Sequence, residues 1–362
     1  MPVRRLPSNP DLAHLKYQAR DLLREHAARL PETAQKIREF HPRFGHAADA
    51  DIFSATLRLS DAQLTIAREH GYPSWARLKR HIEQPTLCDR LDLRHHERIE
   101  DATFRRAVDL LDTGKAEELR ALLQQNPKLV HQHLLFEGGN YFRSPTLLEF
   151  AAENPVRHGT LPSNIVAVAR VVLEAGPDIA SRNATLMLVA TGSVARECKV
   201  QVALIDLLCE YGADPDSAVR AAAVLDEHDA MRALLRHGAK VDLPVAAALG
   251  LVPEFGHLLK TAGPEDRHLA LAVAAQYGHA GIVRSLLDAG EDPDRYNPPG
   301  GHSHATPLHQ AAGAGHEAVV RLLAERGARL DLKDVLWHAT PADWAAHEGK
   351  KEIEEYLRGR MS

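Results

Sequence analysis

A pattern of helix-forming residues that begins at Thr306 begins again at Thr340, and this repetition constrains the fold more than any other feature. Residues 306–330, TPLHQAAGAGHEAVVRLLAERGARL, predict two short helices with apolar faces. Thr306 can cap the first helix, and Gly315 and Gly327 can end the two helices in the left-handed conformation. Helices this short cannot bury their apolar faces alone, so the units must stack on copies of themselves.

Further copies precede this pair. LALAVAAQYGHAGIVRSLLDAGEDPD begins at Leu269, shorter copies begin at Leu243 and Ser217, and the earliest begins at Phe104. With its TPLHxAA start, its Gly-His between two helices and its VVxLLxxxGA close, the unit resembles the ankyrin repeat. The resemblance covers roughly residues 101–360. It implies an all-α solenoid of about eight helix pairs with projecting fingers, more than the three or so units that such an array needs.

Residues 1–84 do not follow the repeat, although their pattern is also helical. The stretch DAQLTIAREHGYPSWARLKRHIE resembles a segment found ahead of ankyrin repeats in many bacterial proteins. The terminal units of a solenoid must hide their apolar faces, so we expect residues 1–84 to form a helical capping module. Tyr72 and Trp75 are its expected packing residues. Residues 85–100 are then a connection, and residues 101–361 form the array.

Charge is unevenly distributed along the chain. Residues 1–84 hold 14 basic and 10 acidic side chains, a net charge of +4, so the overall net charge of −5 leaves −9 for the remainder. The densest basic cluster is Arg77, Lys79, Arg80 and His81, and nucleic-acid binding through this module is one alternative function. However, a net charge of +4 is small for that role, and the cluster has neither a helix-turn-helix signature nor interleaved aromatic residues. We therefore do not expect nucleic acid as a partner, and the acidic array favours a basic protein surface.

Composition narrows the class of protein further. No apolar run approaches the roughly 18 residues of a membrane-spanning helix, and the first residues lack the apolar core of a signal peptide. Three cysteines without CxxC spacing argue against a disulfide framework or a structural zinc site. We predict a cytoplasmic monomer with no membrane contact and no cofactor. Arginine outnumbers lysine and alanine is abundant, which is associated with GC-rich bacterial genomes.

The array departs most from the repeat in residues 131–164, which hold an enlarged finger and a long connection between helices. Glu149 occupies the position that His309 has in the TPLH unit, and we expect Glu153 one turn further on the same helix face. Glu149 either bonds to a backbone amide, as the consensus histidine does, or has a functional role. In the second case the groove could hold a lyase, isomerase or hydrolase site for a small polar molecule, which requires a closed pocket. The catalytic candidates are then Glu149, Glu153, His158 and Tyr141.

The chain holds 22 histidines, which suggests a metal site at first sight. His304 and His338 are separated by one period of the repeat, so we expect them to be neighbours on adjacent fingers. The family resemblance assigns structural roles to several other histidines, and no spacing specifies a third or fourth ligand, so no metal site is predicted. Trp337, at a finger tip, is expected to be exposed and to serve as an interface anchor. Trp344 is expected in the core.

The resemblance to ankyrin repeats implies a scaffold that binds a protein partner through its concave face and fingers. The fold alone supports only that generic function. A small-molecule ligand in the groove is the alternative. The candidate binding residues are Tyr141, Arg143, Glu149, Glu153, Asn154, Tyr277, His304, Trp337 and His338.

Overall fold

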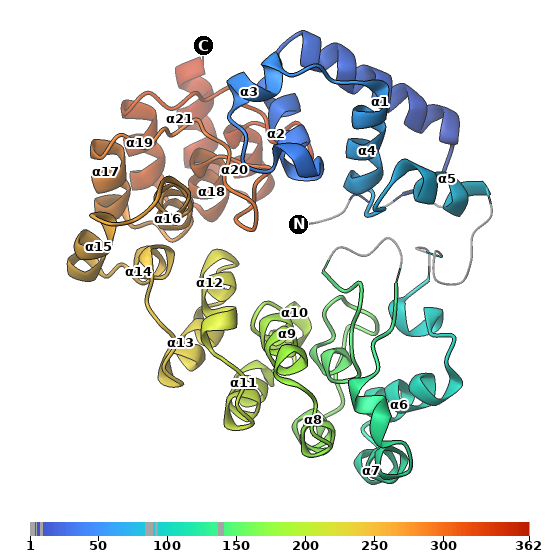
Figure 1. Ribbon diagram of the computed structural model, residues 1–362. Helices are drawn as coiled ribbons and strands as arrows, with labels where there is room; N and C mark the ends of the chain where they lie inside the picture. Colours follow the sequence, from blue (N-terminus) through green and yellow to red (C-terminus); the bar gives the residue numbers. More distant parts are fainter. Residues whose placement is uncertain are drawn as a thin grey trace. The chain divides into compact units, whose positions relative to one another are not determined.

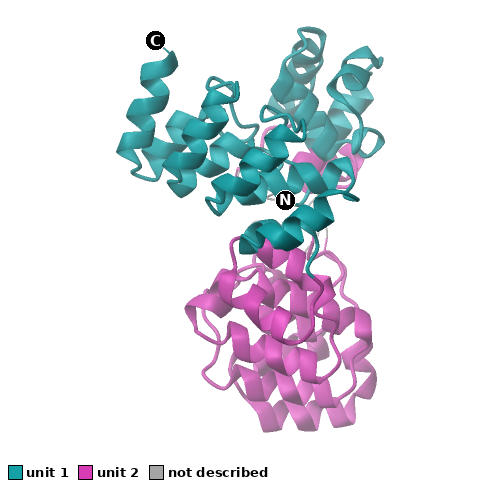
Figure 2. Cartoon of the chain, turned by 90° about the vertical axis from the view of Figure 1, so that its left-hand side faces the viewer, with its two compact units in different colours: residues 1, 13–66, 241–362 teal, residues 2–12, 67–240 magenta. Residues whose placement is uncertain are grey.

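The computed structural model describes residues 4, 6–7, 10–83, 90, 93–136 and 141–361. Residues 137–140 of the enlarged finger and part of the predicted connection lie outside the described residues. All regular structure in the described part is helical, which confirms the predicted all-α class (Figure 1). The chain divides into two compact units, shown in Figure 2: unit 1 comprises residues 1, 13–66 and 241–362, and unit 2 comprises residues 2–12 and 67–240.

Unit 2 contains four helix pairs of the repeat, in which 3₁₀ helices carry the label η. The first members pack in one row: α6 (Ala102–Asp112), η5 (Leu148–Ala152), α9 (Ile179–Ala190) and α12 (Asp216–Val224). The second members pack in another row: α7 (Ala116–Gln125), α8 (Ile165–Glu174), α11 (Gln201–Glu210) and α13 (His228–Arg236). The remaining helices are α5 (Trp75–Glu83), η3 (His95–Arg98), η4 (Pro127–His131) and α10 (Ser193–Glu197).

Unit 1 contains another four pairs. The first members again pack in a row: α14 (Leu243–Leu249), α16 (Pro264–Gln276), α18 (Pro307–Ala314) and α20 (Pro341–His347). Each packs against its second member: α15 (Val252–Leu259), α17 (Ala280–Asp288), α19 (Glu317–Glu325) and α21 (Lys351–Met361). These stacked pairs confirm the predicted solenoid. The helices before the array are α1 (Leu12–Ala27), α2 (Pro31–Phe40), η1 (Pro42–Phe44), α3 (Asp49–Ser54) and most of α4 (Leu59–Glu69).

Small side chains allow the first helices to stack closely. Ala311 and Ala312 of α18 are fully buried, and α18 packs against both α16 and α20. Its partner α19 buries the larger side chains Val319, Val320 and Leu323. The array therefore places small residues between neighbouring first helices and branched residues between the two members of a pair.

Two glycines between the helices of a pair take the left-handed conformation that the sequence predicts. The φ angle is +79° at Gly278 and +90° at Gly315. A Cβ atom on Gly278 would lie 2.6 Å from Nδ1 of His316 in the next unit. That histidine donates a hydrogen bond of 2.8 Å from Nε2 to the carbonyl oxygen of Gln276. Gly278 is therefore required both by its own backbone and by the side chain that links two units.

Helix α2 contacts the finger that precedes Thr306 within unit 1. The Gln35 side chain donates a hydrogen bond to the Ser303 carbonyl oxygen, and both residues are buried. The Ser303 hydroxyl donates to Oε2 of Glu39 at 3.3 Å. Part of the predicted capping module thus packs on a finger of the array. Its role as a cap of the open end stays a prediction.

The two predicted packing residues of the N-terminal module differ in burial. Tyr72 is 1% exposed, which confirms the prediction. Trp75 is only half-buried, because it stands at the first position of α5, where the helix starts at the surface.

We predict that Gly278→Ala lowers the free energy of unfolding by about 1 kcal/mol or more, because the new Cβ both strains a left-handed backbone and displaces His316. Urea denaturation followed by circular dichroism measures the change. The matched control is Gly281→Ala in α17, where no atom lies within 4 Å of the new Cβ. That substitution should leave stability unchanged or raise it by roughly 0.5–1 kcal/mol. Equal effects of the two substitutions would contradict the prediction.

Candidate functional site

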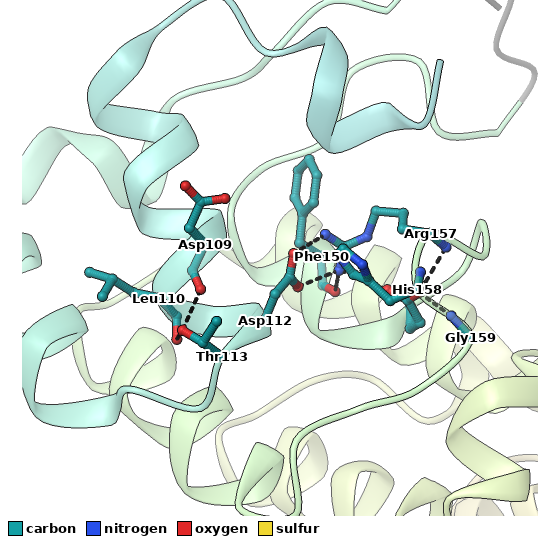
Figure 3. A network of polar contacts seen from close by, with 9 residues as sticks. Asp109, Leu110, Asp112, Thr113, Phe150, Arg157, His158 and Gly159 are labelled. Atoms are coloured by element: carbon teal, nitrogen blue, oxygen red, sulfur yellow. Dashed lines mark hydrogen bonds and ion pairs between the residues drawn. The ribbon is translucent and has the colours of Figure 1, made fainter. Parts of the chain in front are cut away.

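An ion-pair network lies in the enlarged connection of unit 2 and is centred on Arg157, whose side chain is 1% exposed (Figure 3). Its guanidinium donates to both carboxylate oxygens of Asp112, at 2.7 and 2.8 Å, and to the carbonyl oxygen of Phe150 at 2.8 Å. The guanidinium carbon also lies 5.0 Å from the centroid of the Phe150 ring. His158 donates to the same Asp112 at 3.1 Å. Arg157 therefore holds the connection against α6.

Glu153 completes this network. One oxygen accepts the backbone N–H groups of Arg157 (2.7 Å), His158 and Gly159 (3.0 Å). The other oxygen is paired with the Arg157 guanidinium at 2.9 Å. The side chain is fully buried. A carboxylate with this set of donors organises the loop that follows it, which is a structural role.

The two predicted carboxylates do not share a helix face. The segment that holds Glu149 forms only the 3₁₀ helix η5, which ends at Ala152. Glu153 follows it with φ at +50°, and its side chain turns to Arg157. The expected spacing of one α-helical turn is therefore wrong, because the chain leaves the helix one residue before Glu153.

Glu149 makes the same local hydrogen bond as the residue at its position in other units. It accepts the backbone N–H of Thr146 at 2.8 Å and the Thr146 hydroxyl at 3.2 Å. His309 Nδ1 accepts the N–H of Thr306 at 3.2 Å, and Asp343 accepts the N–H of Thr340 at 2.9 Å. Glu149 thus makes the half of a capping box in which the side chain accepts the N–H at the start of the helix. Burial raises the pKa of Glu149, and the hydrogen bonds from Thr146 oppose that rise.

Among the remaining candidates on the insertion, the structure brings Tyr141 and Asn154 together. Tyr141, which is 48% exposed, donates from its hydroxyl to Oδ1 of Asn154 at 2.9 Å. Asn154 in turn donates to the carbonyl oxygen of Leu188 at 3.0 Å. Arg143 is exposed, and its backbone carbonyl oxygen accepts the N–H of Phe136 at 2.8 Å. These contacts fix the base of the enlarged finger to α9, and they leave the Tyr141 ring at the surface.

Two hollows of the described residues lie away from these side chains. One, of about 400 Å³, is lined by residues of η4 and the start of α6, such as Asp101 and Lys128. Another, of about 430 Å³, is lined by Val241 and residues of α15. Neither is lined by Glu149 or Glu153.

A second candidate site lies at the last fingers of unit 1, and we call His304, Asp334, Trp337 and Trp344 the aromatic finger cluster. Trp337 is 65% exposed, which confirms the prediction for this finger tip. Its ring centroid lies 5.2 Å from that of His304 and 6.0 Å from that of Trp344. Both pairs meet edge to face, an arrangement that aromatic rings favour. His304 is 4% exposed.

The buried carboxylate of Asp334 holds the finger in place. It is fully buried, and its Oδ1 accepts the N–H groups of Leu336 (2.9 Å) and Trp337 (2.7 Å). Its Oδ2 accepts the N–H of Ala339 at 3.1 Å and the indole N–H of Trp344 at 3.0 Å. The prediction of Trp344 as a core residue is only partly right, because this bond holds the half-buried ring at the edge of the unit.

The other candidates in unit 1 are less closely grouped. His338 is exposed with φ at +56°, and its backbone N–H donates to the Asp334 carbonyl oxygen at 3.2 Å. The ring contacts of His304 are with His302, Trp337 and Trp344, so aromatic rings and not His338 surround it among the described residues. Tyr277 is half-buried and stacks on His279 at 6.3 Å.

The described residues also bear on metal ligands, membrane spans and the basic cluster of residues 77–81. No group of three or more metal-ligating side chains occurs within them. No helix in the described part combines the length and the apolar character needed to cross a membrane. In the basic cluster, Lys79 and Arg80 are exposed and Lys79 forms an ion pair with Glu83 at 3.6 Å.

Reasoning from the sequence missed three residues that organise these sites: Asp112, Arg157 and Asp334. Arg157 lies four residues after Glu153, and this spacing is a signal for an ion pair. Asp112 lies 45 residues from Arg157 along the chain, and no local pattern links the two. Asp334 begins the finger, and the turn-forming tendency of aspartate could have indicated its bonds to the following N–H groups.

We predict that Arg157→Met lowers the free energy of unfolding by about 3–5 kcal/mol, because it leaves Glu153 and Asp112 without their buried cation. Chemical denaturation measures the loss. The control is Arg106→Met, which removes an exposed pair of Arg106 with Glu118 (3.1 Å) on the same helix pair and should change stability by about 0–1 kcal/mol. A small loss for Arg157→Met would show that the network is not desolvated as the structure indicates.

We predict that Glu149→Gln retains stability at pH 7, because an amide oxygen still accepts the Thr146 N–H. Glu149→Ala removes that acceptor and should lower the free energy of unfolding by about 1–3 kcal/mol. Since burial raises the pKa of Glu149 above 4.5, the folded state takes up this proton more readily than the unfolded state. The wild type should therefore lose stability relative to Glu149→Gln as pH rises above that value.

Urea denaturation of the three proteins at pH 4 and pH 7 tests this. A Gln variant as unstable as the Ala variant, or a wild type that gains on the Gln variant at higher pH, would contradict the structural role of Glu149.

Comparison with known proteins agrees with this geometry. A family model described as ankyrin repeats (3 copies) matches residues 243–334 and 271–360. Human cyclin-dependent kinase 4 inhibitor B is 33% identical over 125 residues, which cover 33% of this chain and 88% of that protein. Human cyclin-dependent kinase inhibitor 2A is 31% identical over 120 residues, 32% of this chain and 74% of that protein.

Mouse ankyrin repeat and SAM domain-containing protein 6 is 37% identical over 93 residues, which cover 26% of this chain. This chain spans only 10% of that larger relative. The match to most of a kinase inhibitor, together with the stacked helix pairs and their capping boxes, shows that the chain belongs to the ankyrin repeat family, whose arrays are protein-interaction scaffolds.

Proposed function

We propose that the protein binds a protein partner through the fingers of unit 1, with Trp337 as the central anchor. The observation that carries this proposal is the 65% exposure of a tryptophan on a finger that its own neighbours hold in place. Exposed tryptophans with a fixed orientation are frequent hot spots of protein interfaces, because they bury a large area at little cost in side-chain entropy.

The form of the finger supports this proposal. Three backbone N–H bonds to Asp334 fix the turn from Leu336 to Ala339, and a fourth, from the indole of Trp344, ties that ring to the same carboxylate. The edge contacts with His304 and Trp344 orient the Trp337 ring. A partner therefore does not have to order this surface on binding.

Charge supports a basic partner surface. The chain beyond residue 84 has a net charge of −9, and such an excess favours association with a positively charged surface at low salt. Two of the relatives are named as inhibitors of kinases, and their names therefore point to action on another protein. The partner of this chain is proposed only as a protein with a basic contact surface.

The remaining predicted binding residues belong to this proposal in different ways. Tyr141 and Arg143 are exposed on the insertion of unit 2 and can extend a contact surface there. Glu149 and Glu153 are buried and take part only by shaping that insertion. A bacterial, cytoplasmic and monomeric protein remains our proposal, supported by the arginine-rich composition and the small number of cysteines.

We predict that Trp337→Ala weakens partner binding by about 2 kcal/mol or more, roughly 30-fold, because it removes the anchor. The partner is first isolated by quantitative affinity capture from the source cell on immobilised wild type, and its affinity for each variant is then measured by calorimetry. The matched control is Tyr17→Ala in α1, which removes another exposed aromatic side chain (59%). Retention of the partner at full affinity by Trp337→Ala would overturn the proposal.

A further inference from the structure

The carboxylate of Asp334 is buried without a cation. Its four hydrogen-bond donors are N–H groups, and within the described ranges no lysine or arginine forms an ion pair with it. Two other buried carboxylates have a cation partner: Glu153 is paired with Arg157, and Glu227 with Arg196. N–H dipoles stabilise a carboxylate, but they do not cancel its charge. The aromatic finger cluster therefore keeps a net negative charge at its centre.

The histidines around Asp334 do not neutralise this charge. Burial lowers the pKa of His304 to about 4, and it lowers the pKa of His309 to about 4 as well. Both imidazoles are consequently neutral near pH 7. Nδ1 of His304 is buried and has no hydrogen-bond partner, so the cluster still holds one unused hydrogen-bonding group.

The backbone of Trp337 is bonded directly to this carboxylate. Its backbone N–H is bonded to Asp334 at 2.7 Å, and most of its ring is in solvent. The face of an indole ring carries a negative quadrupole and attracts cations within about 6 Å of its centroid. A nearby carboxylate with no cation of its own adds to that attraction.

We infer that the aromatic finger cluster binds the guanidinium group of an arginine side chain in the protein partner. This inference rests on the proposed function and names the chemistry that the finger recognises. A guanidinium is planar, stacks on an indole ring and is less strongly hydrated than the ammonium of lysine, so it loses less on leaving water. The net charge of −9 beyond residue 84 also favours a positively charged partner.

The test is a nuclear magnetic resonance titration of the full chain, labelled at the tryptophan indole nitrogens, with N-acetyl-arginine methylamide. The matched probe is N-acetyl-citrulline methylamide, which has nearly the same shape but a neutral urea group. We expect a saturable shift of the Trp337 indole signal with the arginine compound and binding at least five-fold weaker with the citrulline compound. The Trp337→Leu variant keeps an apolar side chain but no ring, and the Trp344 signal should then lose its preference for arginine.

Equal affinity for the two compounds, or an arginine preference that persists in Trp337→Leu, would overturn the inference. The result also separates this inference from the proposed function. If Trp337→Ala loses the protein partner while arginine and citrulline bind equally, the partner site stands and the guanidinium assignment falls. If arginine is preferred at Trp337 while Trp337→Ala keeps the partner at full affinity, the finger recognises arginine but is not the partner site proposed above.

Discussion

The structure depends on hydrogen bonds between neighbouring units, because a pair of short helices cannot bury its own faces. His309 shows the full link. Its Nδ1 accepts the N–H of Thr306 at 3.2 Å, and its Nε2 donates to the carbonyl oxygen of Ala339 in the next finger at 3.1 Å. One side chain therefore caps a helix and sets the spacing to its neighbour. The left-handed glycines serve the same purpose between the helices of a pair, since a side chain from the next unit lies against Gly278.

In unit 2, Glu149 occupies the position of His309, and it shows which hydrogen bond of this link can be replaced by another. A carboxylate cannot donate, so Glu149 keeps the cap on Thr146 but cannot reach the next finger as His309 does. The hydroxyl of Thr146 instead bonds to that of Ser181 in α9, the first helix of the next unit. These two hydroxyl groups therefore link the neighbouring units in place of a histidine. The raised pKa of Glu149 is thus a consequence of burying this hydrogen-bond acceptor.

The repeat made much of the fold predictable. Contacts within a solenoid are between nearest neighbours, so the period placed the caps at Thr306 and Thr340, the left-handed Gly315 and the exposed Trp337. Contacts that do not repeat carry no such signal. The bond from Gln35 to Ser303 joins residues 268 positions apart, and the ion pair of Arg157 with Asp112 joins segments whose meeting depends on how a long connection packs. In the aromatic finger cluster, the exposed Trp337 was predictable from the sequence, and the buried Asp334 that holds it was not.

The two candidate sites differ in how they hold a buried carboxylate, and this difference decides which of them is free to bind. In the insertion, Arg157 forms ion pairs with both Glu153 and Asp112, and the loop amides bond to one oxygen of Glu153. Such a network makes a rigid connection and offers little to a ligand. In the finger, Asp334 has amide and indole donors but no cation among the described residues, and the neighbouring Trp337 is mostly exposed to solvent. Ankyrin units with equivalent backbones can therefore have a structural role at one place and a binding role at another. The difference depends on whether the chain itself supplies a cation to the buried carboxylate.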